Sequence, residues 1–342
     1  MRYPESLKPG GRIGIIAPSF GCPDEIHRAM VESAAERFKT DGYKVVMGPN
    51  CYETKGIGKS NTPEACAAEI NDFLINDRAD AVLACRGGET MCEDLPFVDF
   101  DAIAKARPKW YMGFSDNTNL TFTLPTICDT AAIYGPNASN FGMRPWHRCI
   151  SDSFDLMRGK LKEVGNYDGW EGTRQDMEPD PLAPFKITEP FRMLLAGTAK
   201  DGTAFSGRLI GGCLDCLSNM CGTRFDHAEE FADKNRNNGL IWFLEACDLT
   251  PLGVRVALWK LENAGWFKNV RGFLIGRPLH YTDEIMGLDR ITAVTSILEK
   301  HGVPILMDLD IGHLPPMMPL VSGAMADVAV CAGDLSVKMR FE

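Results

Sequence analysis

Short apolar runs alternate with segments of helical spacing through the first half of the chain. Residues 12–17, 43–47 and 79–85 are compact apolar runs rich in β-branched side chains, which predicts buried strands. Further strands are predicted at 109–113 and 131–134, and helices at 27–39, 61–75, 100–106 and 117–124. Strands separated by helices indicate a parallel, doubly wound sheet.

The pattern changes between residues 151 and 192, where Gly, Pro, Asp and Glu are frequent and no periodicity is visible. Such a stretch is typical of a linker or an active-site loop. Strands and helices resume beyond it, with strands predicted at 239–244, 270–275 and 304–307. We therefore expect an α/β fold of two domains: residues 1–165, a linker or active-site loop at 166–192, and a smaller α/β domain at 193–342.

The charge balance of the chain limits the kinds of partner that the protein is expected to bind. The chain has 342 residues, and 36 Lys and Arg against 46 Asp and Glu give a net charge of −10. This balance argues against nucleic acid or an anionic membrane as partner, because both select basic surfaces. The N-terminus lacks a signal-peptide core and no run is long enough to span a bilayer, so the 12 cysteines indicate reduced thiols in a cytoplasmic protein.

Ser115 is the strongest local candidate for chemistry. It follows a predicted strand and precedes a helix in Gly113-Phe114-Ser115-Asp116. A serine in this position can be a nucleophile, with the N–H of Asp116 available to an oxyanion, or it can simply cap the helix. Asn117 stands where a G-x-S-x-G elbow would have its second glycine.

Arg86-Gly87-Gly88 ends the preceding strand. Two glycines allow a ligand to approach the backbone, and their N–H groups are candidate oxyanion donors; an ordinary tight turn is the alternative. The phosphate-binding patterns G-x-G-x-x-G and G-x-x-x-x-G-K-[ST] are absent from the sequence.

A serine nucleophile needs a base and an acid that orients the base. Among six histidines, His313 stands out because it lies in a proline-rich segment after a predicted strand, although packing on proline is the alternative; His147 and His280 also stay open. Glu245 ends an apolar strand, so it is either functional or held in an ion pair, for which Arg255 is the candidate partner.

Cys213, Cys216 and Cys221 have one C-x₂-C spacing without a second ligand pair, which indicates core packing and no metal.

Several segments together resemble the LD-carboxypeptidase family of serine peptidases, which includes the microcin C immunity peptidases. The similarity covers 7–19, 86–88, 113–116, 207–214, 242–245 and 312–324, in the same order and with similar spacing. The segments 134–142 and 170–171 resemble the microcin-immunity branch more closely than the muropeptide-recycling branch.

The resemblance implies a triad of Ser115, Glu245 and His313, with the nucleophile on a flavodoxin-like N-terminal domain. It implies backbone donors from Gly87, Gly88 and Asp116, and substrate contacts from Arg86 and Trp170. Family members are typically cytoplasmic homodimers without a cofactor.

Two positions depart from the family. Cys213 stands where Asn is usual, and Ala246 where a second acid is frequent, which affects the expected substrate more than the reaction.

We expect a serine peptidase that hydrolyses an amide near a free carboxylate in a small peptide or peptidyl-nucleotide, either a muropeptide or a microcin C-type compound. An α/β-hydrolase-type esterase and a non-enzymatic two-domain binding module are the alternatives.

Overall fold

The computed structural model describes residues 1–172 and 180–341, and it divides them into two compact units. The first unit contains residues 1–161 and 180–185, and the second contains 162–172 and 186–341. Each unit is built around a β-sheet with parallel strands. The expected mixed α/β architecture with two domains is confirmed.

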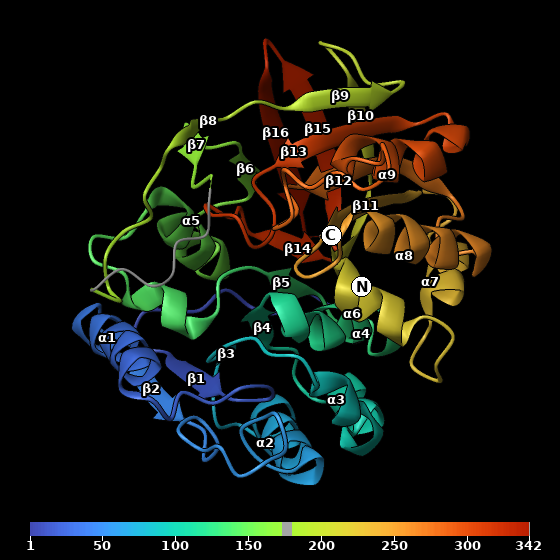
Figure 1. Cartoon of the computed structure of the whole chain (residues 1–342). Helices are drawn as coiled ribbons and strands as arrows, with labels where there is room; N and C mark the ends of the chain where they lie inside the picture. Colours follow the sequence, from blue (N-terminus) through green and yellow to red (C-terminus); the bar gives the residue numbers. More distant parts are fainter. Residues whose placement is uncertain (173–179, 342) are drawn as a thin grey trace. The chain divides into compact units, whose positions relative to one another are not determined.

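Five strands of the first unit pair in parallel, in the order β2-β1-β3-β4-β5. This is the order of flavodoxin-type doubly wound sheets. Figure 1 shows α1 on one face of this sheet and α2, α3 and α4 on the other. The strands are β1 (Arg12–Ile16), β2 (Lys44–Met47), β3 (Ala81–Ala84), β4 (Trp110–Gly113) and β5 (Ala132–Tyr134), and the helices are α1 (Glu25–Thr40), α2 (Pro63–Ile75), α3 (Phe100–Lys105), α4 (Thr118–Ile127) and α5 (Arg148–Met157).

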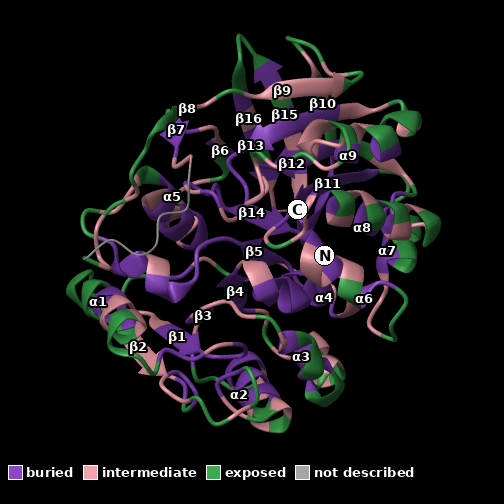
Figure 2. Cartoon of the chain, viewed as in Figure 1, coloured by how far each residue is buried: buried purple, intermediate pink, exposed green. Residues whose placement is uncertain are grey.

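Local signals in the sequence account for these elements. The Asp24 side chain accepts from the backbone N–H of His27 and caps α1, and Thr62 caps α2 ahead of Pro63, which suits the first helical turn. Strands β3 and β4 are buried along their whole length, as a sheet covered on both faces requires (Figure 2).

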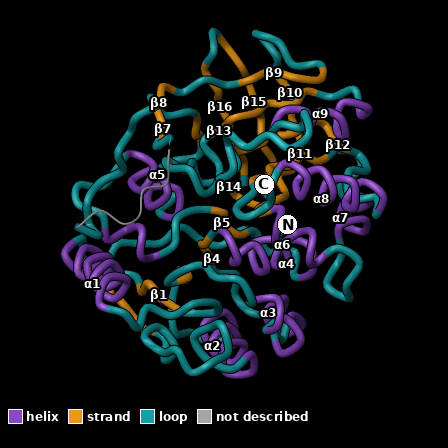
Figure 3. The backbone as a smooth tube through the Cα atoms, viewed as in Figure 1, coloured by secondary structure: helices purple, strands orange, loops and turns teal. Residues whose placement is uncertain are grey.

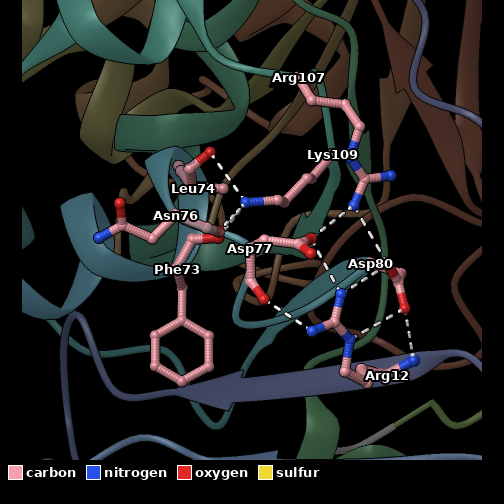
Figure 4. Close-up of polar contacts among 8 residues, drawn as sticks. All are labelled: Arg12, Phe73, Leu74, Asn76, Asp77, Asp80, Arg107 and Lys109. Atoms are coloured by element: carbon pink, nitrogen blue, oxygen red, sulfur yellow. Dashed lines mark hydrogen bonds and ion pairs between the residues drawn. The ribbon is translucent and has the colours of Figure 1, made fainter.

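Lys109 shows how one buried charge is compensated at the end of α2 (Figure 4). Its ammonium donates to the backbone carbonyls of Phe73 and Leu74 at 2.9 and 3.2 Å, and also to that of Asn76. A lysine at this end of a helix satisfies carbonyls that have no partner within the helix. Next to it, Arg12 and Arg107 both contact Asp77 and Asp80, near the starts of β1 and β3.

The second unit contains an eight-stranded sheet in the order β6-β16-β15-β10-β11-β12-β13-β9. Its centre, β10-β11-β12-β13, is parallel, and the flanking pairs are antiparallel. Figure 3 shows the strands of this sheet in orange. Helices α6 and α9 both pack against α8. The strands of this sheet are β6 (Glu163–Gly165), β9 (Leu194–Gly197), β10 (Ala204–Cys213), β11 (Leu240–Glu245), β12 (Val270–Gly276), β13 (Pro304–Leu309), β15 (Met325–Cys331) and β16 (Asp334–Arg340). The short strand β14 (Leu320–Ser322) is not part of it, and the helices are α6 (Leu214–Met220), α7 (Ala228–Lys234), α8 (Pro251–Asn263) and α9 (Arg290–Leu298).

The stretch without periodicity contains more regular structure than the sequence predicts. Helix α5 extends into it, strand β6 lies within it, and further along β7 (Gly169–Trp170) pairs with β8 (Glu189–Pro190). Strands of two residues are too short to produce an alternating pattern, which explains why this stretch resembled a loop. Residues 173–179 of this stretch lie outside the described residues. Over the part of the chain that is described, none of the helices combines the length and the hydropathy that crossing a bilayer requires.

Candidate active site

Ser115 lies at a sharp turn between a strand and a helix in the first unit. Strand β4 ends at Gly113, a 3-10 turn covers Ser115–Asn117, and α4 follows. Ser115 has a φ of 63°, which places a residue with a Cβ in the left-handed region. Such strain is kept where the surrounding structure enforces it, and it is typical of serine nucleophiles held at a strand-to-helix turn.

Asn117 ties this turn to its neighbours. Its Nδ2 donates to the carbonyl of Arg86 at 3.1 Å and to Oδ1 of Asn137 at 3.2 Å, and its Oδ1 accepts from the Tyr111 hydroxyl at 2.6 Å. Asn137 Oδ1 also accepts from the backbone N–H of Phe114. Asn117, which stands in place of a second glycine, therefore holds the turn in position, a role that no local sequence pattern indicates.

The side chain of Asp116 points into the first unit and is buried. Its Oδ2 accepts from the Ser19 hydroxyl at 2.5 Å and from the backbone N–H of Met91 at 2.9 Å. Burial raises the pKa of this carboxyl, and both hydrogen bonds oppose that change. The carboxyl thus anchors the turn, and the proposed oxyanion donor of this residue is its backbone N–H.

Gly87 lies directly against Ser115. A Cβ on Gly87 would stand 3.1 Å from the Ser115 Cβ and 3.3 Å from its Oγ, closer than most Cβ atoms approach a neighbour. A glycine here keeps the space beside the hydroxyl open. The guanidinium of Arg86, which precedes it, lies 5.4 Å from the ring centroid of Phe20. The expected oxyanion loop and the expected nucleophile are therefore adjacent within the first unit.

Glu245 and His313 meet in the second unit. His313 Nδ1 lies 2.8 Å from Glu245 Oε2, and both side chains are almost fully buried. Glu245 ends β11, and His313 follows β13, so the carboxyl ends of two parallel strands bring them together. Arg255, the ion-pair partner considered for Glu245, donates to Ser296 instead.

Gly312 makes this contact possible. It has a φ of +105°, and a Cβ there would stand 2.5 Å from Glu245 Oε2. Burial lowers the pKa of His313, but the charge of Glu245 and the hydrogen bonds that the imidazole makes with Cys247 and Glu245 outweigh this effect and raise the pKa to about 10. The carboxylate therefore stabilises an imidazolium strongly.

A buried ion pair supports the segment that carries His313. Arg277 donates to the carbonyl of Asp308 at 2.8 Å and pairs with Asp310, and both members of that pair are almost inaccessible to solvent. Trp170 covers the guanidinium, with its ring centroid 4.8 Å from Arg277 Cζ. The indole is buried and also packs on Tyr281 at 4.8 Å. The sequence pattern predicted a linker or an active-site loop around Trp170, whereas the structure places this residue in β7, inside the second unit.

The remaining candidates have structural contacts. His147 caps α5 and packs on Phe185, and His280 pairs with Asp283. Cys213 is buried and donates to Asp215. Within residues 1–172 and 180–341, no group of three or more His, Cys, Asp or Glu is arranged to hold a metal ion.

Comparisons with known proteins follow the same two-part division. The family model described as the LD-carboxypeptidase N-terminal domain matches residues 13–135, and the one described as the C-terminal domain matches residues 206–328. The Microcin C7 self-immunity protein MccF of Escherichia coli is 26% identical over 310 residues, which cover 90% of this chain and 87% of that protein.

Solved structures share the fold. A MccF-like protein from Bacillus anthracis str. Ames superposes with a TM-score of 0.81 at 20% identity, covering 99% of this chain and 100% of that one. MccF in complex with aspartyl sulfamoyl adenosine superposes with a TM-score of 0.82 at 22% identity, covering 99% of each chain. The family models cover most of the chain and both of its parts, and the chain is a peptidase that belongs to the LD-carboxypeptidase family.

Proposed function

We propose that this peptidase hydrolyses an amide near a free carboxylate by means of a triad of Ser115, His313 and Glu245. The observation that carries the proposal is the conformation of Ser115, whose φ of 63° at a strand-to-helix turn matches what a serine nucleophile requires. The Glu245–His313 pair, at 2.8 Å, supplies an oriented base.

Each residue has one role in the proposed reaction. Ser115 Oγ attacks the carbonyl carbon and gives its proton to His313, which passes it to the leaving amine. Water then releases the acyl group from Ser115, with His313 again as the base. Glu245 accepts from Nδ1–H, fixes the tautomer and stabilises the imidazolium. The N–H groups of Asp116 and of Gly87 or Gly88 hold the oxyanion.

The substrate class follows from the relatives and from the basic residue beside the turn. MccF is named as a self-immunity protein against microcin C7, and one of its solved complexes contains aspartyl sulfamoyl adenosine. We therefore propose a peptidyl-nucleotide of microcin C type or a muropeptide as substrate, with Arg86 as the partner of the free carboxylate. Trp170 contributes through its packing on Arg277, which supports the segment that carries His313, and the working form is a cytoplasmic homodimer that needs no cofactor.

A substrate panel tests the proposal. The full-length protein is incubated with a cell-wall tetrapeptide, a microcin-type aspartyl-nucleotide and a simple ester, and products are identified by mass spectrometry. We expect amide cleavage by the native protein and none by Ser115→Ala. Hydrolysis of the ester alone would support the esterase alternative, and binding without turnover of any substrate would support the binding-module alternative.

A further inference from the structure

Two cysteines at C-x₂-C spacing stand where β10 passes into α6 in the second unit. Cys213 is the last residue of β10 and the N-cap of α6, and Cys216 is the third residue of this helix. Side chains at these two positions face each other, as they do in a capping box. The structure accordingly brings the two thiols into a hydrogen bond with each other.

The two thiols differ in their access to solvent. Only 1% of Cys213 is exposed, whereas Cys216 is partly exposed. The hydrogen bond with Cys216, burial and the charge of Glu245 raise the pKa of the Cys213 thiol well above its ordinary value. Cys213 therefore stays protonated at neutral pH, and a dissolved reagent reaches Cys216 first. An accessible cysteine beside a second one that can resolve its adduct is typical of thiol–disulfide exchange sites.

Asp215 lies between the two cysteines and provides a proton acceptor. Its Oδ2 accepts from Cys213 Sγ at 3.4 Å and from the backbone N–H of Cys247 at 3.0 Å. Its Oδ1 accepts from the backbone N–H of Asp248, also at 3.0 Å. These bonds fix the carboxylate on the segment after β11, with one oxygen against the buried thiol. A carboxylate held in this way can take the thiol proton when Cys213 becomes the attacking group.

A second group of thiols, in the first unit, shows what distinguishes this pair. Cys85 is hydrogen-bonded to Cys22 and Cys51, and all three side chains are fully buried. A dissolved disulfide cannot reach them, so contact between thiols is not sufficient for exchange. Cys213 and Cys216 combine such a contact with access from solvent at one of the two sulfurs.

We propose that Cys213 and Cys216 are a redox-active dithiol that exchanges with small disulfides such as glutathione disulfide and closes to an internal disulfide. The inference goes beyond the proposed function and does not depend on it. The dithiol lies beside the proposed acid of the triad, because Cys213 is the partner of Glu245 in the pairing of β10 with β11.

The exchange takes place in two steps. The Cys216 thiolate attacks one sulfur of glutathione disulfide, forms a mixed disulfide and releases the first glutathione. Cys213 then gives its proton to Asp215 and attacks the Cys216 sulfur, which releases the second glutathione. The S–S bond of the reagent breaks and the Cys213–Cys216 bond forms, so the reagent takes up two electrons. The two protons from the cysteines end on the two released glutathione thiols.

Mass spectrometry of the full-length protein tests the proposal. The exposed Cys92 and Cys331 are replaced by serine so that they take up no glutathione, and the protein is incubated with glutathione disulfide and quenched with acid. We expect the mass to fall by two hydrogen atoms and peptide mapping to show a Cys213–Cys216 link. Two unreacted thiols, a lasting glutathione adduct on Cys216, or a link from Cys216 to Cys247 would each overturn the proposal.

A matched pair of variants in the same background assigns the two thiols. In Cys213→Ser, the glutathione adduct on Cys216 should persist because no thiol resolves it. In Cys216→Ser, Cys213 should stay reduced because it is buried. Equal behaviour of the two variants would refute the assignment. Cys22, Cys51 and Cys85 should stay reduced in every sample, as an internal control for an intact fold. Because no substrate is used, the result is independent of whether Ser115 is the nucleophile.

Discussion

His313 Nδ1 and Glu245 Oε2 lie 2.8 Å apart in the second unit, although 68 residues separate them along the chain. Both side chains are almost fully buried, so the carboxylate acts on the imidazole with little screening by solvent. The pair resembles the base and acid of a catalytic triad, and it determines how activity should depend on pH.

Replacing Glu245 by Gln should change the pH profile. Glu245 raises the pKa of His313, and only the neutral imidazole can accept the proton of Ser115. Without the carboxylate the pKa falls, so the acidic limb of kcat/KM moves to lower pH while kcat decreases about 10²- to 10⁴-fold. The profile is measured with a substrate that the native protein hydrolyses.

Another Glu–His pair in the same unit provides the control. His301 Nε2 lies 2.7 Å from Glu262 Oε2. His301 is in the 3-10 turn after α9, and Glu262 is in α8. Glu262→Gln should leave both kcat and the acidic limb unchanged. An acidic limb that does not move in Glu245→Gln would contradict the assigned role of this carboxylate.

Gly87→Ala should impair catalysis without unfolding the protein. The added Cβ would lie 3.1 Å from the Ser115 Cβ and crowd the hydroxyl, so we expect kcat to fall at least about tenfold. The backbone of Gly87 is not in the left-handed region, so Tm should change by only a few degrees. Unaltered kcat in a well-folded variant would show that the space beside Ser115 is not needed.

Arg277→Met should destabilise the second unit. It leaves the buried Asp310 without its cation, which typically costs about 3–5 kcal/mol of unfolding free energy. The double variant with Asp310→Asn removes the uncompensated charge and should recover part of the loss. Urea denaturation measures both, and a loss in Arg277→Met below about 1 kcal/mol would argue against a tightly coupled pair.

Lys109→Met should reduce stability through the end of α2. Three backbone carbonyls lose their shared donor in a buried position, at a cost of about 1–3 kcal/mol. Lys105 is exposed in α3, and Lys105→Met serves as the control with little expected effect. Similar unfolding free energies for the two variants would mean that the ammonium does not stabilise the helix end.

The fold of the first unit could be predicted because its signals are local. Strand β3, for example, is a short apolar run, and Thr62 and Pro63 mark the start of α2 at adjacent positions. Strands β15 and β16 form an antiparallel pair at the end of the chain and were not predicted. Buried residues alternate with more exposed ones in both strands, but the more exposed positions of β15 include Met325 and Ala329, so the pattern of residue types was weak.

The site could be predicted only in part. Ser115 stands at a strand-to-helix transition that short-range patterns reveal, but no local pattern links Glu245 to His313, and their pairing was expected only from the family resemblance. Asn117 holds the turn through a contact with Asn137, 20 residues away along the chain, and Arg277 supports the His313 segment through Asp310, 33 residues away. Such contacts follow from tertiary packing, which the order of residue types does not encode locally.

The central claim is that Ser115 and His313 act as one catalytic unit. The most direct measurement compares kcat for Ser115→Ala, His313→Ala and the double variant on the best substrate of the panel. If the two residues act together, each single variant loses several orders of magnitude and the double variant is little worse than either. If the fold losses in kcat of the two single variants multiply in the double variant, or if Ser115→Ala keeps its activity, the proposed mechanism is wrong.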